Sequence, residues 1–348
     1  MNAQRSSDSV SASSWRSARL FVTDEFAAPP VILRVDDSVI GTLGNFSAST
    51  GKAKSKKTFN VCAIVAAAMT GGTVLNYSAS LPPEKRRILY VDTEQSRFHC
   101  KRVLCRILRL AGLPTDVHPP LLEFLCLRGY ATKERLRKIE EAIYDLDDLG
   151  LVVIDGIRDL AHDINSPGEA TDLITKLMQW TDERRIHIHT VLHLNKGDDN
   201  TRGHLGTELN NKAETVLQIT KDDFDRDISS VAAMHIRDRD FEPFAFRINA
   251  DALPEQVEDY QLRQTTAAKS FDYAEVCEAK HREALELLFS KADRVSYSSL
   301  IGRLQSSYAA IGHSFGINKA KQLKVFLENK RMIVKEDKFY RYNPDFHY

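Results

Sequence analysis

Short runs of apolar residues alternate along most of the chain with longer segments in which apolar positions recur every three or four residues. Such runs, bounded by Gly, Pro or Asp, are typical of buried strands, and the longer segments are typical of amphipathic helices. Their alternation predicts an α/β fold with a mostly parallel sheet covered by helices on both faces. Strands are expected over 31–35, 39–43, 45–49, 87–91, 121–127, 151–154, 186–194, 215–219 and 231–237, and helices over 59–69, 96–111, 132–146 and 167–184.

The last two of these strands are expected to be antiparallel, and the pattern changes after them. Residues 251–270 lose their apolar periodicity, which indicates a linker. The chain then predicts three helices, over 273–289, 298–308 and 318–329, followed by a hairpin of 332–335 with 339–342. This order is typical of a winged helix. The expected organisation is a disordered tail over 1–28, an α/β domain over 29–250, a linker over 251–270 and a winged-helix-like domain over 271–348.

Composition supports a globular protein with more than one domain. The 348 residues include 48 Lys and Arg against 48 Asp and Glu, and 43% are hydrophobic. The longest apolar run, 61–69, is about half of what a membrane-spanning helix needs. The N-terminal residues lack an apolar signal segment, and five scattered cysteines form no CxxC pair. We therefore expect a cytoplasmic protein with reduced thiols and no membrane partner.

The zero net charge is a sum of unlike parts. Residues 51–57 contain four Lys and no acid, and residues 84–109 contain eight basic and three acidic residues. Residues 215–260 contain five basic and eleven acidic residues. Local anion sites are therefore expected in spite of overall neutrality, and the acidic stretch could meet a basic face of a second copy.

The run Gly51–Thr58, between an apolar strand and a helix of small residues, follows the phosphate-loop pattern G-x-x-x-x-G-K-[ST] except at one position. Lys56 stands where the second Gly is expected, so it is strained if that position needs a positive φ. The alternatives are that Lys56 adds charge to the phosphate site, or that the run is a solvated basic turn. Lys57 would reach the β- and γ-phosphates of ATP, and the Thr58 hydroxyl would bind Mg²⁺. The residues expected to surround the nucleotide are Gly51, Lys52, Ala53, Lys54, Ser55, Lys56, Lys57, Thr58 and Phe59.

A second acidic element supports this interpretation. Residues 151–154 are all apolar and end in Asp155, so a buried strand would deliver this carboxylate to the edge of the sheet beside the loop. There it could hold Mg²⁺ through water. The alternative is a carboxylate that only caps a turn or a helix.

Six motifs in order resemble those of RecA-like P-loop ATPases, most closely the branch that contains the hexameric plasmid helicase RepA. The resemblance covers about residues 31–250. It is carried by 51–58, 90–94, 151–155, 191–196, 202–208 and 235–239.

The resemblance implies roles for residues at the ends of two strands. Glu94 would be the catalytic Glu that polarises the attacking water, with Asp92 as the competing base and a helix-capping role as the alternative. His193 and Asn195 would sense the γ-phosphate. A hydrogen-bonded core histidine is the alternative for His193.

The resemblance also implies DNA contact and self-assembly. Arg202 and His204 would lie on a loop that touches single-stranded DNA. Arg237 and Arg239, two apart on one strand, would reach the γ-phosphate of a neighbouring subunit as arginine fingers, unless they pair with Asp238, Asp240 or Glu242. In the C-terminal domain, the residues expected to contact DNA are Lys319, Lys321 and Lys324.

These observations together predict an ATP-hydrolysing DNA motor that works as a homo-oligomer, most simply a hexameric helicase in the replication or mobilisation of a plasmid or mobile element. Other replication or mobilisation proteins are possible partners. Two alternatives remain open. One is an ATP-dependent DNA-binding regulator without unwinding activity, and the other is a recombination-associated ATPase similar to RadA or KaiC.

Overall fold

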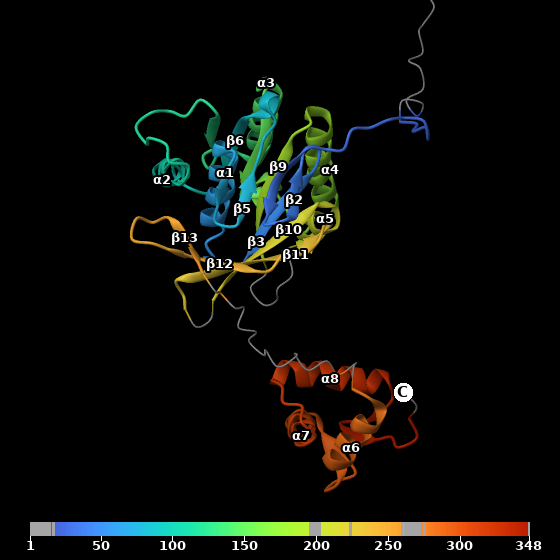
Figure 1. The fold of residues 1–348 in the computed structure, drawn as a ribbon. Helices are drawn as coiled ribbons and strands as arrows, with labels where there is room; N and C mark the ends of the chain where they lie inside the picture. Colours follow the sequence, from blue (N-terminus) through green and yellow to red (C-terminus); the bar gives the residue numbers. More distant parts are fainter. Residues whose placement is uncertain are drawn as a thin grey trace, which may run out of the picture. The chain divides into compact units, whose positions relative to one another are not determined.

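A computed structural model describes residues 15, 18–194, 203–222, 225–258, 260, 273 and 276–346 of the chain. It divides into two compact units, Met1–Leu262 and Arg263–Tyr348 (Figure 1). No helix of the described residues is both long and apolar enough to cross a membrane.

A nine-stranded sheet forms the centre of the first unit, in the order β13-β12-β11-β10-β3-β9-β8-β6-β7. The six strands from β10 to β7 run parallel, and β11, β12 and β13 are added antiparallel. The expected α/β class with a mostly parallel, helix-flanked sheet is thus confirmed. The strands are β3 (Phe46–Gly51), β6 (Arg87–Asp92), β7 (Leu122–Cys126), β8 (Leu149–Asp155), β9 (His187–His193), β10 (Thr215–Lys221), β11 (Ile228–Ile236), β12 (Phe244–Ile248) and β13 (Pro254–Val257).

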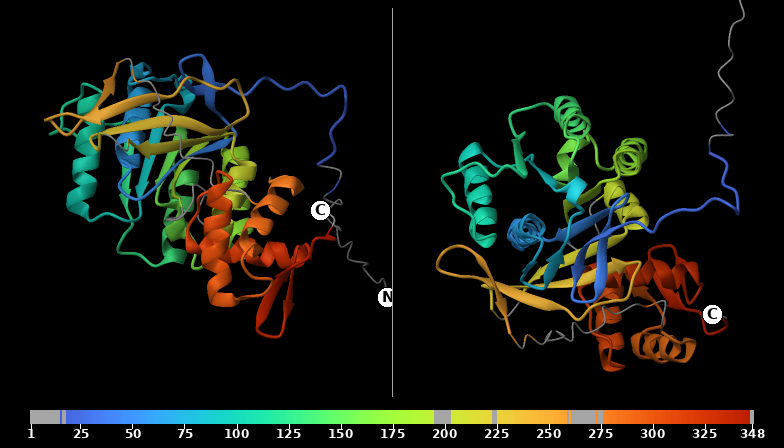
Figure 2. Two further views of the ribbon diagram at one scale, coloured as in Figure 1. Left: turned by 90° about the horizontal axis from the view of Figure 1, so that it is seen from below. Right: turned by 45° about the horizontal axis from the view of Figure 1, so that its top comes forward.

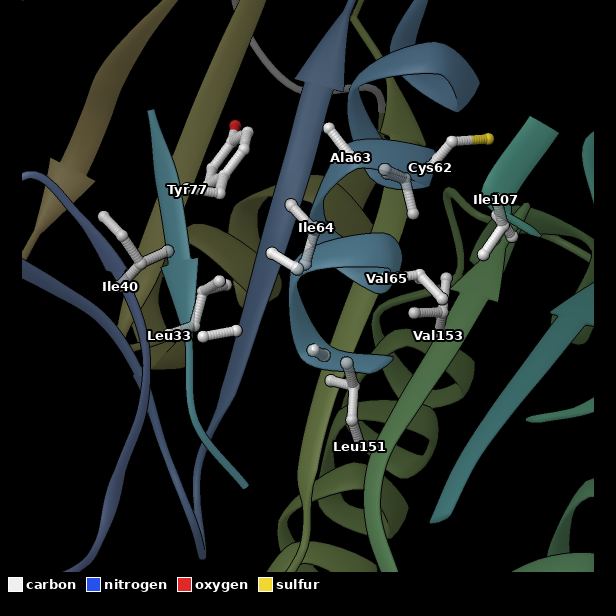
Figure 3. Packing of buried hydrophobic residues seen from close by; sticks show 14 of the residues in the cluster. Leu33, Ile40, Cys62, Ala63, Ile64, Val65, Tyr77, Ile107, Leu151 and Val153 are labelled. Atoms are coloured by element: carbon white, nitrogen blue, oxygen red, sulfur yellow. The ribbon is translucent and has the colours of Figure 1, made fainter. Parts of the chain in front are cut away.

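Helices cover both faces of this sheet, as two further views show (Figure 2). Alternate strand residues point to opposite faces, so on β8 Leu151 and Val153 join one apolar cluster while Val152 and Ile154 join the other. The first cluster holds the mostly buried helix α1, which is rich in small residues, together with α2 (Figure 3). The second cluster holds α3, α4 and α5. The helices are α1 (Lys57–Thr70), α2 (Arg97–Leu110), α3 (Thr132–Asp145), α4 (Pro167–Arg184) and α5 (Gly203–Lys212), with short 3₁₀ turns η2 (Pro83–Lys85) and η3 (Ile157–Leu160).

A separate four-stranded sheet packs against α1 within the first cluster. It consists, in the order β2-β1-β5-β4, of β1 (Val31–Val35), β2 (Ser38–Thr42), β4 (Thr73–Val74) and β5 (Tyr77–Ala79). The sequence predicted β1 and β2 but not β4 and β5. Those two strands are only two and three residues long and exist because β5 pairs with β1 across about 40 residues of chain, a contact that local periodicity does not reveal.

The antiparallel end of the main sheet differs from expectation in the same way. Strands β12 and β13 were not predicted, and β13 lies inside the segment interpreted as a linker from residue 251. Ile248 pairs with Pro254, and the two strands extend the sheet to its edge, where proline is tolerated. Residues 254–257 therefore belong to the first unit and not to a linker.

The second unit has an apolar core of its own, built from helices α6, α7 and α8 and a three-stranded sheet in the order β14-β16-β15. Helix α6 begins at Glu278, five residues later than expected, and β14 was not predicted. The elements are α6 (Glu278–Phe289), β14 (Val295–Ser296), α7 (Tyr297–Ala310), α8 (Ile317–Asn329), β15 (Ile333–Glu336) and β16 (Phe339–Tyr342).

Candidate nucleotide-binding site

The loop between β3 and α1 lies at the carboxyl end of the parallel strands, with β3 held between β10 and β9. Gly51 closes the strand, and a Cβ there would lie 2.3 Å from the Ile219 carbonyl oxygen and 2.5 Å from Ser55 Oγ. Only glycine fits that contact. Lys56 adopts a φ of 67°, so the position of the second motif glycine does require the left-handed conformation, and a lysine occupies it.

The Lys56 side chain reaches a neighbouring turn. Its ammonium donates to the carbonyl oxygens of Arg226 and Asp227 in the turn between β10 and β11. Burial, followed by the nearby Lys221 cation, lowers the pKa of Lys56. The side chain therefore ties the loop to this turn while it also lines the cavity described below.

Lys57, by contrast, points into the loop and is buried. Its ammonium donates to the carbonyl oxygens of Gly51 at 2.9 Å and Lys52 at 3.0 Å, and to His193 Nδ1 at 3.1 Å. Burial lowers the pKa of Lys57 to about 8, against the opposing influence of Asp155 and Glu94. Beside it, Ser55 Oγ is buried and has no hydrogen-bond partner among the described residues. A buried cation held by neutral oxygens and a hydroxyl without a partner are the groups that an anion such as a phosphate would satisfy.

Thr58 and Asp155 meet, as their positions in the sequence predicted. Thr58 Oγ1 donates to Asp155 Oδ2 at 2.9 Å, and Tyr90 OH donates to the same oxygen at 2.9 Å. Burial, reinforced by Asp92, raises the pKa of Asp155 to about 6. No group of three or more His, Cys, Asp or Glu side chains in the described part of the chain could hold a metal alone. One hydroxyl and one carboxylate fit Mg²⁺, which takes its other ligands from water and phosphate oxygens.

Glu94 and Asp92 have different surroundings although both follow β6. Asp92 is buried and accepts the backbone N–H groups of Glu94 and Gln95 and the Gln95 side-chain amide, so it organises the turn into α2. Burial raises the pKa of Asp92. Glu94 instead lies 3.6 Å from His193, which holds the pKa of Glu94 below its usual value. Between the two carboxylates, Glu94 is the one that is exposed toward the pocket.

The side chains of Ser55, Lys57, Thr58, Asp92, Glu94, Asp155 and His193 line one cavity of about 390 Å³. Sequence reasoning missed one wall of it, which is formed by α2. Arg106 on this helix stacks over the Phe59 ring at 3.7 Å and donates to the Ala252 carbonyl oxygen at 3.0 Å. The excess of basic residues after Glu94 was the available signal, but it did not show which side of the helix would face the loop. The lining residues are Lys54, Ser55, Lys56, Lys57, Thr58, Phe59, Asp92, Glu94, Gln95, His99, Arg102, Val103, Arg106, Asp155, Gly156, Val191 and His193.

Other predicted site residues are only partly described by the structure. Arg202, expected to contact DNA, and Asn195, expected to sense the γ-phosphate, fall outside the described residues. His204, expected on a loop, is exposed in the first turn of α5. Strand β11 ends at Ile236, so Arg237 and Arg239 follow the strand and do not share a strand face as expected.

Both of these arginines are exposed, and Arg237 donates to the Lys212 carbonyl oxygen at 3.1 Å. Among the described residues neither forms an ion pair with Asp238, Asp240 or Glu242.

The three lysines of α8 also differ from one another. Lys324 is partly buried, pairs with Glu328 and lies over the rings of Tyr297 and Tyr340. Lys319 lies over the Tyr273 ring at 4.9 Å. Lys321 is exposed. Two of the three ammonium groups therefore have partners inside the second unit.

Comparison with known proteins gives a family match. Residues 16–199 match the family described as an AAA domain, which is 184 of the 348 residues. No sequence among the curated proteins matches the chain. Among solved structures, the crystal structure of the RadB recombinase aligns with a TM-score of 0.44 and 16% sequence identity, over 62% of this chain and 92% of that chain.

Proposed function

Because the chain belongs to the AAA domain family and carries its ATPase domain, we propose that it is an ATP-driven motor that acts on DNA, most simply a hexameric helicase of plasmid or mobile-element replication. The observation that carries the proposal is the meeting of Lys57, Thr58, Asp155 and Glu94 around one cavity at the carboxyl end of the parallel strands. This edge of an open α/β sheet is where ligands bind.

ATP is the substrate that these side chains suit. The backbone N–H groups at the start of α1 and the Lys57 ammonium would bind its phosphates, and the buried Ser55 hydroxyl would gain a partner. Thr58 and Asp155 would hold Mg²⁺, which neutralises charge on the phosphate oxygens when bound. Glu94, kept ionised by His193, would orient and deprotonate the attacking water. His193 contacts both Lys57 and Glu94, so it would link the phosphate-binding group to the base.

Self-assembly would complete this site. Arg237 and Arg239 follow a strand at the antiparallel end of the sheet, and both are exposed and without ion-pair partners among the described residues. A neighbouring subunit's arginine reaching the γ-phosphate would stabilise the charge of the transition state. The ring would then hydrolyse ATP only when assembled.

DNA contact would come from both units of the chain. Arg202 and His204 would touch single-stranded DNA, and the exposed Lys321 of α8 would serve a winged-helix-like second unit. Hydrolysis in the ring would move these contacts and so pull one strand.

The test compares ATP turnover with and without single-stranded DNA for the wild type, Lys57→Ala and Glu94→Gln. Lys57→Ala is expected to lose both nucleotide binding and turnover. Glu94→Gln is expected to bind ATP normally and to turn it over about 10² to 10⁴ times more slowly, because only the base is lost. Normal turnover in Glu94→Gln would contradict the assigned base.

Strand displacement on a forked substrate tests the helicase assignment separately. DNA-stimulated ATPase activity without strand displacement would favour the regulator or the recombination-associated ATPase. No hydrolysis by the wild type would indicate that Lys56 in the glycine position has disabled the loop.

A further inference from the structure

Helix α2, which begins three residues after Glu94, has an unusual charge. Its 14 residues include five Lys or Arg and no Asp or Glu. Val103, Ile107 and Leu108 face the apolar cluster shared with α1. The opposite, exposed side presents Arg97, Phe98, Lys101, Arg102 and Arg109. Figure 1 shows α2 at the margin of the first unit, clear of the central strands.

The exposed cations of α2 have no counterions within the described part of the chain. None of the hydrogen bonds, ion pairs or ring contacts found there uses the side chain of Arg97, Lys101, Arg102 or Arg109. Helix α3 shows the usual alternative, because Arg137 on α3 pairs with Glu141 one turn later. A helix side with several cations and no acid repels itself slightly, and an external anion would relieve that repulsion.

A groove runs along this side. Its volume is about 200 Å³, and it lies between α2 and the turn from β12 to β13. Arg106 anchors that turn through the Ala252 carbonyl oxygen, so the groove has a fixed wall. Arg102 and Arg106 line both this groove and the nucleotide cavity, so the two lie side by side. The groove is lined by Lys101, Arg102, Cys105, Arg106, Arg109, Asp251, Ala252 and Leu253.

One aromatic ring accompanies these charges. Phe98 is 69% exposed, and its ring meets that of His99 edge-on at 5.4 Å. It precedes Lys101 by three residues and Arg102 by four, so all three lie on one side of the helix. An exposed ring beside unpaired cations suits a ligand that has both phosphates and flat bases.

The alternative ligand for the exposed side of α2 is the acidic stretch, residues 215–260, of a second copy of the chain. Several carboxylates of this stretch already have partners. Asp222 accepts the Tyr260 hydroxyl and the Asp225 N–H, and Asp225 accepts the Asp227 N–H. Asp238 accepts the Val39 N–H at 2.8 Å. These acids shape their own turns, and such a contact would also leave Phe98 without a role.

We propose that the exposed side of α2 binds the phosphate backbone of single-stranded nucleic acid, with Phe98 stacking on a base. The site is separate from the Arg202 loop and from α8. It rests on the proposed action on DNA. Helix α2 follows directly from the turn that carries Glu94. A nucleic-acid strand bound to α2 would therefore press on the element that positions this catalytic carboxylate.

The experiment measures binding of a fluorescently labelled oligothymidylate by the full chain, over a range of salt concentrations. The double variant Lys101→Ala/Arg109→Ala removes two groove cations that lie outside the nucleotide cavity. It is expected to lower the slope of log affinity against log salt by about 1.4, since each lost phosphate contact on a single strand contributes about 0.7. ATP turnover without DNA is expected to stay at the wild-type level.

Phe98 is tested separately. Phe98→Ala is expected to weaken binding roughly 5- to 150-fold, the range for loss of one stacked base, while Phe98→Trp restores it. The matched control for charge is Lys133→Ala/Arg137→Ala on α3, which also removes two exposed cations but from a helix that contains acids. This control is expected to leave the salt slope unchanged.

Three outcomes would overturn the inference. If the wild type binds the oligonucleotide and the α2 variants bind it equally well with the same slope, this site is wrong and the proposed motor function stands. If the variants sediment as smaller species than the wild type but each subunit binds DNA normally, the exposed side of α2 is a contact between subunits. If the wild type binds no single strand even at low salt, both this inference and the proposed action on DNA fail.

Discussion

Strands β3 and β9 carry polar side chains at two places whose surroundings differ. In the middle of the sheet, Ser47 Oγ lies 2.7 Å from His187 Nε2 and 2.8 Å from His189 Nδ1, and Ser49 Oγ lies 2.8 Å from His189 Nε2. His187 Nδ1 completes the chain on the Thr42 carbonyl oxygen at 2.9 Å. All of these side chains are fully buried. Each ring nitrogen has a partner, so the network has no position for a ligand.

At the carboxyl end of the same two strands, polar groups are also buried but not all are satisfied. Ser55 Oγ has no partner in the described part of the chain, and the Lys57 ammonium is held by carbonyl oxygens and by His193. The His193 side chain is 32% exposed. Histidines 187, 189 and 193 thus follow one another along a single strand, two as core residues and one as a wall of the cavity. Between these two places on β3 and β9, the difference is therefore incomplete hydrogen bonding and not the burial of polar groups.

Replacing one histidine at each of the two places by Asn is the strongest test of this comparison. His193→Asn is expected to lower ATP turnover, by up to about a hundredfold if the imidazole stabilises transition-state charge, with unchanged stability to urea. His189→Asn is expected to affect stability and not turnover. Because it leaves buried hydroxyls without partners, it should lower the free energy of unfolding by about 1–3 kcal/mol. Turnover per folded molecule should stay normal. A catalytic defect in folded His189→Asn would break the distinction.

The buried pair also predicts a pH dependence of stability. Burial lowers the pKa of His187 to about 4 and that of His189 to about 3, while the unfolded chain takes up these protons near pH 6.5. The folded state binds fewer protons, so this contribution is fully present above pH 6.5 and is lost as the pH falls. His189→Gln is expected to make the pH slope of the unfolding free energy shallower by about 1.4 kcal/mol per pH unit between pH 6 and pH 5.

Urea denaturation of both proteins at a series of pH values measures this difference. Asp92, Asp155 and Glu214, whose pKa values are raised mainly by burial, oppose the histidines in this range. Both proteins contain these acids, so their effect cancels in the comparison. Identical slopes would show that His189 binds its proton equally well in the folded and unfolded states, and would contradict the lowered pKa.

The smallest expected effect concerns Lys56. Lys56→Gly and Lys56→Ala both remove the ammonium contact with the turn carbonyls, but only glycine adopts a φ of 67° without strain. The glycine variant is therefore expected to be more stable than the alanine variant by about 1 kcal/mol in urea denaturation. The same pair of substitutions at Lys52, where φ is not positive, is the control and should favour alanine or show no difference. Equal stability of the two Lys56 variants would mean that the loop carries no strain there.

Much of the fold follows from local patterns. The apolar run before Asp155 predicts a strand because both of its faces are buried. The run of small residues after Thr58 predicts a helix that is buried between other elements. Strands β4, β5, β12 and β13 escaped prediction because each is five residues long or shorter and is stabilised by pairing with a partner elsewhere in the chain. The last of them, Pro254–Val257, even carries the composition of a linker.

The sequence by itself determined the order of the six parallel strands and of helices α1 to α4, and the position of the phosphate loop. It also brought Lys57, Thr58, Glu94 and Asp155 to one edge, because the carboxyl ends of parallel strands coincide. Only the tertiary structure decided which histidines of β9 are core residues, where Lys56 points and that α2 forms a wall of the cavity. Residue type and spacing describe what a side chain can do, whereas its partners come from segments far away in the chain.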